Sequence, residues 1–223
     1  MPASTTAPTV LAARALLLDM DGTLVDSGPA VERVWRRWAA EHELDGDAVL
    51  RVVHGRQGFA SMAVLLPDRP MELNHADNRR MLAEETADTE GVVPIEGAPA
   101  FLASLAGLPH ALVTSADDAL TRARMGAAGL ELPPVAVTAE HVGASKPDPE
   151  GFLRGAAQLG ADPADCIVFE DSEAGVAAGL AAGMRVIGIG AQAARYGATV
   201  TVDSLAQVRV TADADGTLSV TVN

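Results

Sequence analysis

Short apolar runs recur along the chain, and each has the length of a single strand. They occupy Ala15–Leu18, Ala111–Thr114, Val135–Thr138, Cys166–Phe169, Arg185–Ile189 and Thr199–Val202. Apolar runs without polar alternation are typical of strands that are buried on both faces of a sheet. The pattern therefore predicts a sheet in the interior of the protein.

Helical segments separate most of these runs. The predicted helices span Asp118–Ala128, Pro149–Leu159 and Glu173–Ala182. Asp148 is the predicted N-cap of the second helix, with Pro149 at its first position. Gly160 and Gly183 follow helix ends, where glycine commonly terminates a helix. The alternation predicts an α/β fold, with a parallel sheet and helices on both faces.

Residues 28–92 interrupt this alternation. Val31, Val34, Trp35 and Trp38 recur at helical spacing, and further helices are expected over residues 49–53, 59–66 and 71–89. We therefore predict a helical domain over 28–92, inserted into a core domain of residues 10–27 and 93–223. The connecting segments, 25–29 and 91–97, contain Gly and Pro and are predicted hinges.

The two ends of the chain differ from its middle. Residues 1–9 are rich in Ala, Thr and Pro and are predicted to be a disordered N-terminus. The run Val10–Leu18 is too short to span a bilayer and is interpreted as a core strand. Val208–Thr211 and Leu218–Val222 alternate around Asp215-Gly216, which predicts a C-terminal β-hairpin.

Charge narrows the possible partners. The net charge is −14 and the isoelectric point is about 4.6, which argues against binding to nucleic acid or to anionic membranes. A single cysteine excludes an internal disulfide and is compatible with a reducing compartment. Because we find no targeting segment, we expect a cytoplasmic protein. We also expect it to be a monomer or a weak dimer.

Two carboxylates directly follow the first strand, in Asp19-Met20-Asp21-Gly22-Thr23. In an ideal strand Asp19 and Asp21 would face opposite sides, but a turn at Gly22 lets them converge. Close anions repel unless a cation or a shared proton offsets them. The pair therefore indicates a metal site, an acid/base couple or both.

Three more polar segments fall at or near strand ends. They are Thr114-Ser115, Lys146-Pro147 and Glu170-Asp171-Ser172. Open α/β sheets bind ligands at the carboxyl ends of their strands, so these segments are expected to form one site.

In this order and spacing, the four segments resemble the motifs of the haloacid-dehalogenase-like hydrolase superfamily. The resemblance covers nearly the whole chain and implies a Rossmann-like core with an inserted α-helical C1 cap at residues 28–92. Within the superfamily, the chain is most similar to the glycerol-phosphate and 2-deoxyglucose-6-phosphate phosphatases. Thr114-Ser115-Ala116-Asp117 departs from that group's Thr-Ser-Gly-Thr.

The resemblance implies a role for each carboxylate. Asp19 would be the nucleophile that forms an aspartyl-phosphate, and Asp21 would be the general acid and base. Mg²⁺ would be bound by Asp19, the backbone carbonyl of Asp21 and Asp171, with Glu170 in or next to its ligand shell. With Lys146 and Mg²⁺, three carboxylates reach neutrality, so we expect hydrolysis to require the metal.

The remaining site residues are implied in the same way. Thr114 and the backbone N–H groups of Ser115 and Ala116 would bind phosphoryl oxygens, and Lys146 would neutralise charge on Asp19 and the phosphate. Arg56 and Gln57 lie between predicted cap helices and are candidates for substrate selection.

Three other functions are alternatives to a phosphatase. Dehalogenases of the superfamily do not need the acid at Asp21. A sugar phosphomutase resembling β-phosphoglucomutase would carry a histidine at Val31 and a Gly-x-Ser-Arg loop where this chain has Gly55-Arg56-Gln57-Gly58. A non-catalytic binding protein would not need every catalytic position filled. The sequence favours a Mg²⁺-dependent phosphatase acting on a small sugar or polyol phosphate.

Overall fold

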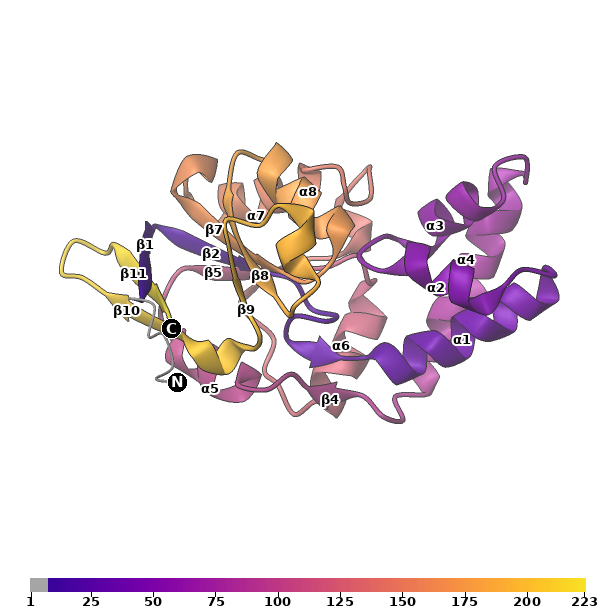
Figure 1. Ribbon diagram of the computed structural model, residues 1–223, viewed down its shortest axis with the longest axis horizontal. Coiled ribbons are helices and arrows are strands. Elements are labelled where there is room, and N and C mark those ends of the chain that lie inside the picture. Colours follow the sequence, from indigo (N-terminus) through magenta and orange to yellow (C-terminus); the bar gives the residue numbers. More distant parts are fainter. Residues whose placement is uncertain (1–7) are drawn as a thin grey trace, which may run out of the picture.

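A six-stranded parallel sheet forms the centre of the protein in the computed structural model, which describes residues 8–223 (Figure 1). The strand order is β6-β5-β2-β7-β8-β9. The strands are β2 (Ala15–Leu18), β5 (His110–Val113), β6 (Val135–Val137), β7 (Cys166–Glu170), β8 (Arg185–Ile189) and β9 (Val200–Val202). Every neighbouring pair is parallel, so the predicted α/β architecture is confirmed.

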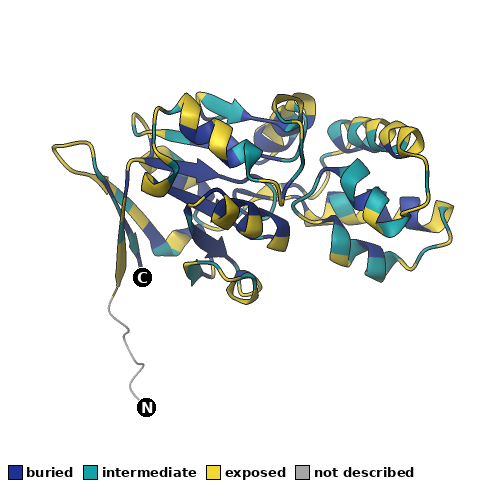
Figure 2. Ribbon diagram, turned by 90° about the horizontal axis from the view of Figure 1, so that it is seen from above, coloured by how far each residue is buried: buried dark blue, intermediate teal, exposed yellow. Residues whose placement is uncertain are grey.

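Helices cover both faces of this sheet (Figure 2). They are α5 (Ala98–Ser104), α6 (Asp118–Ala127), α7 (Glu150–Gln158) and α8 (Glu173–Ala181). Leu16 and Leu18 of β2 point into the hydrophobic core that contains α5 and α6, whereas Leu17 points into the core that contains α7 and α8. Burial of both sides of β2 explains why its sequence is apolar without alternation.

A separate helical unit follows the first motif and lies to one side of the sheet (Figure 1). It consists of α1 (Gly28–Glu41), α2 (Gly46–Val53), α3 (Gly58–Leu65) and α4 (Met71–Ala87). Trp35, Trp38, Met62 and Met81 belong to its own hydrophobic core. The predicted tryptophan-containing helix is therefore present, and its aromatic rings pack inside the helical unit.

The two chain segments that connect the units pair with each other. Strands β3 (Val25–Asp26) and β4 (Val93–Pro94) are antiparallel, and the Ile95 N–H donates to the Leu24 carbonyl at 2.9 Å. This pairing could not be predicted from the sequence, because the partners lie 67 and 69 positions apart and carry no local signal. The connection is a paired two-strand link.

A small antiparallel sheet joins the ends of the described chain. Its order is β1-β11-β10, with β1 (Thr9–Ala13), β10 (Val208–Ala212) and β11 (Leu218–Val222), which confirms the predicted hairpin. The prediction of a single strand over Val10–Leu18 was wrong. The chain changes sheets at Arg14, whose guanidinium donates to the Asp215 carbonyl at 2.8 Å.

Other local expectations need correction. The predicted disordered segment 1–9 falls largely on residues outside the described range, but Thr9 already pairs with Val222 in β1. Pro149, and not Asp148, is the N-cap of α7. Helix α5 was not predicted. Short 3-10 helices lie at η1 (Ala139–His141), η2 (Pro163–Asp165), η3 (Ala193–Tyr196) and η4 (Leu205–Gln207). Among the described helices, none has the length and apolarity needed to cross a membrane.

Candidate active site

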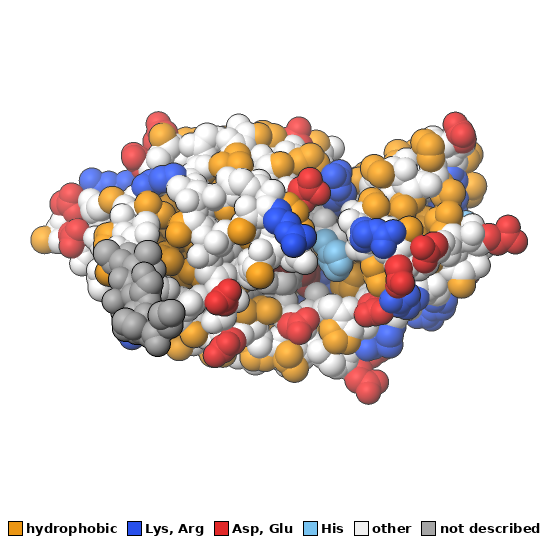
Figure 3. Space-filling model, in the orientation of Figure 1, with side chains coloured by type: hydrophobic (Ala, Val, Ile, Leu, Met, Phe, Trp, Pro, Cys, Tyr) orange, Lys and Arg blue, Asp and Glu red, His pale blue; other side chains and the backbone are white. Residues whose placement is uncertain are grey.

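A hollow separates the sheet domain from the helical unit on the face shown in Figure 3. It contains a cavity of about 290 Å³, which is lined by residues from both units. Asp19 follows β2, Thr114 follows β5 and Asp171 follows β7, so three parallel strands end at this cavity. Asp21 also lines it. The structure thus brings together side chains that are as many as 152 positions apart in the sequence.

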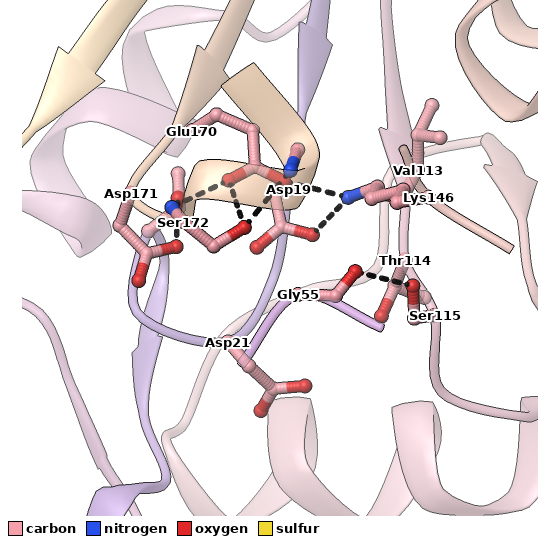
Figure 4. Close-up of polar contacts among 12 residues, drawn as sticks. Asp19, Asp21, Gly55, Val113, Thr114, Ser115, Lys146, Glu170, Asp171 and Ser172 are labelled. Atoms are coloured by element: carbon pink, nitrogen blue, oxygen red, sulfur yellow. Dashed lines mark hydrogen bonds and ion pairs between the residues drawn. The ribbon is translucent and has the colours of Figure 1, made fainter. Parts of the chain in front are cut away.

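Lys146 is the central cation of the site (Figure 4). Its ammonium donates to Asp19 at 2.6 Å, to Glu170 at 2.8 Å and to the Val113 carbonyl at 3.1 Å. All three charged side chains are buried. Burial raises the pKa of Asp19 to about 8, against the opposing effect of Lys146. The single ammonium of Lys146 therefore does not balance the negative charge of the surrounding carboxylates.

Carboxylate oxygens of Asp19, Glu170 and Asp171 lie within 4.8 Å of one another. Burial, followed by the nearby charges of Glu170 and Asp19, raises the pKa of Asp171 well above its ordinary value. A divalent cation would relieve this crowding, and an all-oxygen donor set suits Mg²⁺. The residues present therefore fit such an ion.

Glu170 has a different position from the other two carboxylates. One oxygen accepts from Lys146, and the other accepts from the backbone N–H and the hydroxyl of Ser172, at 2.9 and 3.0 Å. Asp171 is less engaged: within residues 8–223, its carboxylate accepts one side-chain hydrogen bond, from Thr23 at 3.3 Å. Asp171 is thus the better placed metal ligand, while Glu170 holds Lys146 and the start of α8.

Glycine is required where the first motif turns. Gly22 has φ +85°, and a Cβ atom there would overlap the carboxylate of Asp171. The absence of a side chain lets the loop after β2 approach the residue after β7, which is the approach that brings the acidic groups together.

The segment after β5 forms a compact turn. The Thr114 hydroxyl accepts from the Ala116 N–H at 3.1 Å, so the Ala116 N–H already has a partner, whereas the Thr114 O–H can still donate to a phosphoryl oxygen. The Ser115 hydroxyl donates to the Gly55 carbonyl at 3.0 Å and thereby links the core to the helical unit. Thr114, Ser115 and Ala116 all line the cavity.

The loop between α2 and α3 lies directly on the core. Gln57 donates its backbone N–H to the Ser145 hydroxyl at 2.8 Å and its side-chain amide to the Ala139 carbonyl at 3.3 Å. Gln57 therefore anchors the loop to the core. Arg56 lines the cavity, where its charge is available to a ligand.

Two cavity residues were missed by the sequence analysis. Arg124 on α6 donates to Asp21 at 2.8 Å and to Glu85 on α4 at 2.9 Å. Both Arg124 and Glu85 are buried, with 3% and 7% of their surface exposed. Their helical spacing could have indicated that both side chains are buried. Arg124 lies four positions after the buried Leu120, and Glu85 lies four positions after the buried Met81.

Burial also alters Glu85. It raises the pKa of this carboxyl to about 7, against the opposing effect of Arg124. A carboxyl that is poised near neutrality at the edge of a cavity is a common feature of functional sites.

Comparison with known proteins identifies the family of this chain. The chain matches the haloacid dehalogenase-like hydrolase family over residues 13–183. It is 44% identical over 182 residues to hexitol phosphatase A of Escherichia coli (strain K12), covering 81% of this chain and 84% of that protein. It is 33% identical over 196 residues to glycerol-1-phosphate phosphohydrolase 2 of Saccharomyces cerevisiae, covering 83% and 78%.

A solved structure shows the same architecture. A HAD family hydrolase from Deinococcus radiodurans R1, crystallised with bound phosphate and sodium, superposes with a TM-score of 0.63 at 31% identity, covering 87% of this chain and 92% of that one. The residues matched by the family include the first, second and third motifs and Glu170-Asp171 of the fourth. The chain belongs to the haloacid dehalogenase-like hydrolase family.

Proposed function

We propose that this protein is a phosphoric monoester hydrolase that releases phosphate from a small sugar or polyol phosphate. The observation that carries the proposal is the meeting of Asp19, Asp21, Thr114 and Asp171 at one cavity. The relatives named above are phosphatases of hexitol and glycerol phosphates, which supports this substrate class. The cavity volume of about 290 Å³ is just below the usual range of about 300–1,000 Å³ for small-molecule sites, which suits a small metabolite.

The proposed reaction has two steps. In the first, a carboxylate oxygen of Asp19 attacks phosphorus, the ester P–O bond breaks, and Asp21 gives a proton to the departing alkoxide. In the second, water attacks the phosphorus of the aspartyl-phosphate while Asp21 takes a proton from that water. The Asp19–phosphorus bond then breaks, so that inorganic phosphate leaves and both carboxyls return to their starting states.

Lys146 would stabilise negative charge during both steps. Its ammonium lies 2.6 Å from Asp19, the carboxylate that would carry the phosphoryl group. Asp19, Asp171 and the Asp21 backbone carbonyl would hold Mg²⁺, which supplies positive charge to the phosphoryl oxygens. In both steps the Thr114 hydroxyl and the Ser115 backbone N–H would bind the phosphoryl oxygens at the end of β5.

The helical unit would act as a cap. We propose that residues 28–92 open and close over a core of 10–27 and 93–223, with the β3–β4 link as the hinge. Closure would exclude bulk water while the phosphoenzyme waits for one positioned water. Arg56 would contact the substrate from the cap. Gln57, bonded to Ser145 and Ala139, would hold the closed position.

Hydrolysis is favoured over phosphomutase activity. Val31 lines the cavity at the position where the resemblance would place a mutase histidine. An apolar side chain there offers no acid or base to a bound sugar. The related proteins named above are hydrolases by name.

The direct test is phosphate release from a panel of hexitol, glycerol, hexose and short-acid phosphates. We expect release from polyol or sugar phosphates with Mg²⁺, and none after chelation or in Asp19→Asn. The same samples are analysed for isomerised sugar phosphate, which would identify a mutase. A panel without release in the presence of Mg²⁺ would refute the proposed function.

A further inference from the structure

Asp21 is held by donors from two directions. Ser27 donates its hydroxyl to one carboxylate oxygen at 2.6 Å, and Arg124 donates to the other at 2.8 Å. Each carboxylate oxygen has two lone-pair sites, so both oxygens keep a site for a proton or a ligand. Asp21 is therefore fixed in orientation while it remains able to react.

Arg124 is unusually constrained for an arginine. It lies on α6 of the core, its side chain is 4% exposed, and its second terminal nitrogen donates to Glu85 at 2.9 Å. Because the guanidinium is planar and rigid, two carboxylates on its two nitrogens fix its plane. The position of Arg124, and thus of its contact with Asp21, depends on Glu85.

The partner of Arg124 comes from the other unit. Glu85 belongs to α4, and α4 packs against α6 across the boundary between the helical unit and the core (Figure 1). A purely structural bridge would need only the Arg124–Glu85 pair. Arg124 instead uses its other nitrogen on a carboxylate that lines the cavity. This second contact points to a role in the reaction.

We propose that Arg124 is a positioning residue that orients the Asp21 carboxylate, and that Glu85 of the cap completes this arrangement when the cap lies on the core. The inference rests on the proposed function, in which Asp21 gives a proton to the leaving alkoxide. Displacement of a reacting group by about 1 Å can lower a rate about 100-fold. A fixed guanidinium prevents such displacement.

The test compares two leaving groups in single-turnover cleavage, with enzyme in excess. An alkyl phosphate such as glycerol 1-phosphate needs a proton on its leaving oxygen, whereas p-nitrophenyl phosphate releases a stable anion without one. We expect Arg124→Met to slow cleavage of the alkyl ester about 30-fold or more, because general-acid catalysis contributes about 100-fold or more. Cleavage of the nitrophenyl ester should change by less than about threefold.

Arg122→Met is the matched control. Arg122 lies on the same helix, is exposed, and pairs only with Asp118 at 2.9 Å among the contacts of the described residues. Both substrates should be cleaved at the wild-type rate by this variant. Glu85→Ala should give an alkyl-specific loss that is smaller than that of Arg124→Met, because Arg124 would keep one of its two partners.

Arg124→Lys provides a second variant in case Arg124→Met does not fold. Lysine keeps the charge but cannot bridge both carboxylates in one plane, so an intermediate alkyl-specific loss is expected. Equal losses on both substrates in the Arg124 variants, or no loss, would overturn the inference. The proposed function would still stand in that case, because the wild-type enzyme would cleave the esters. Wild-type enzyme that cleaves neither ester would overturn both.

Discussion

Lys146 is the only lysine among the 16 Lys and Arg residues of the chain. It lies against Asp19 and Glu170, which are both buried. A compact ammonium fits between two carboxylates and a carbonyl, where a planar guanidinium would need more room. Position 146 therefore requires lysine and not arginine.

Substitution of Lys146 therefore should be severe. We expect Lys146→Met to lower phosphatase activity about 100-fold or more, as removal of a charge-stabilising group commonly does. Lys146→Arg should not restore activity, because its shape differs from that of lysine. Arg154→Met, which removes an exposed cation on α7, is the matched control for loss of one positive charge. Full activity of Lys146→Arg would contradict this view of the site.

The raised pKa of Glu85 predicts how the stability of the protein depends on pH. Burial raises this pKa from 4.5 to about 7. Between these pH values Glu85 is therefore protonated in the folded protein and ionised in the unfolded chain. The folded state binds more protons between these values, and the free energy of unfolding therefore falls as pH rises from about 4.5 to 7. The full effect is on the order of 3 kcal/mol.

The measurement is urea unfolding of the wild type and Glu85→Gln at several pH values between 5 and 8. The difference in free energy of unfolding between the two proteins isolates Glu85 from the other titrating groups. Relative to the variant, the wild type should lose stability as pH rises through this window. Parallel profiles would show that Glu85 titrates near its ordinary pKa.

At the scale of elements, the predictions succeeded where a segment carries its own signal. The apolar strand at Ala15–Leu18 was predicted because both of its faces are buried. The break at Arg14 and the β3–β4 pair were missed, because they depend on partners far away in the chain. The Arg124–Glu85 pair was missed for the same reason: the sequence placed each residue on a helix, but only the packing of α4 on α6 brings them together.

The loop between α2 and α3 offers a test of how the helical unit rests on the core. Gly55 has φ +75°, and a Cβ atom there would overlap the Ser172 hydroxyl of the core. Gly55→Ala should therefore displace the loop and lower kcat/KM about tenfold or more. Gly107 has a similar φ of +78° with open space around it, so Gly107→Ala carries the same backbone strain without the overlap.

Both glycine variants should lose about 1–2 kcal/mol of stability from the strained backbone, and only Gly55→Ala should lose activity. Thermal melts and kinetic constants of the two variants make the comparison. Equal activities would mean that the loop does not need to rest on Ser172 during catalysis.

At the scale of the whole molecule, negative charge is the main constraint. The net charge of −14 repels an anionic substrate, so attraction has to come from cations at the cavity. Arg56 lines it, and Lys146 lies next to Asp19, whereas the charge of Arg124 is already paired with Asp21 and Glu85. A divalent ion would add to this local positive charge.

Mg²⁺ should therefore stabilise the folded protein. At a concentration 100 times the dissociation constant, binding adds about 2.7 kcal/mol, which corresponds to a rise in Tm of roughly 5–10 °C for a chain of this size. Asp171→Asn should remove most of this shift. Sodium chloride at matched ionic strength controls for general screening of the net charge. An equal rise with sodium would contradict a specific Mg²⁺ site.

The central claim is that a phosphoryl group is carried covalently by Asp19. It is tested most directly by acid quench of the enzyme during turnover of a polyol phosphate, followed by peptide mass spectrometry. We predict one added phosphoryl group on the peptide that contains Asp19, removable by hydroxylamine and absent from Asp19→Asn. Continued phosphate release with no modified peptide at any quench time, or with modification of a different residue, would contradict the account.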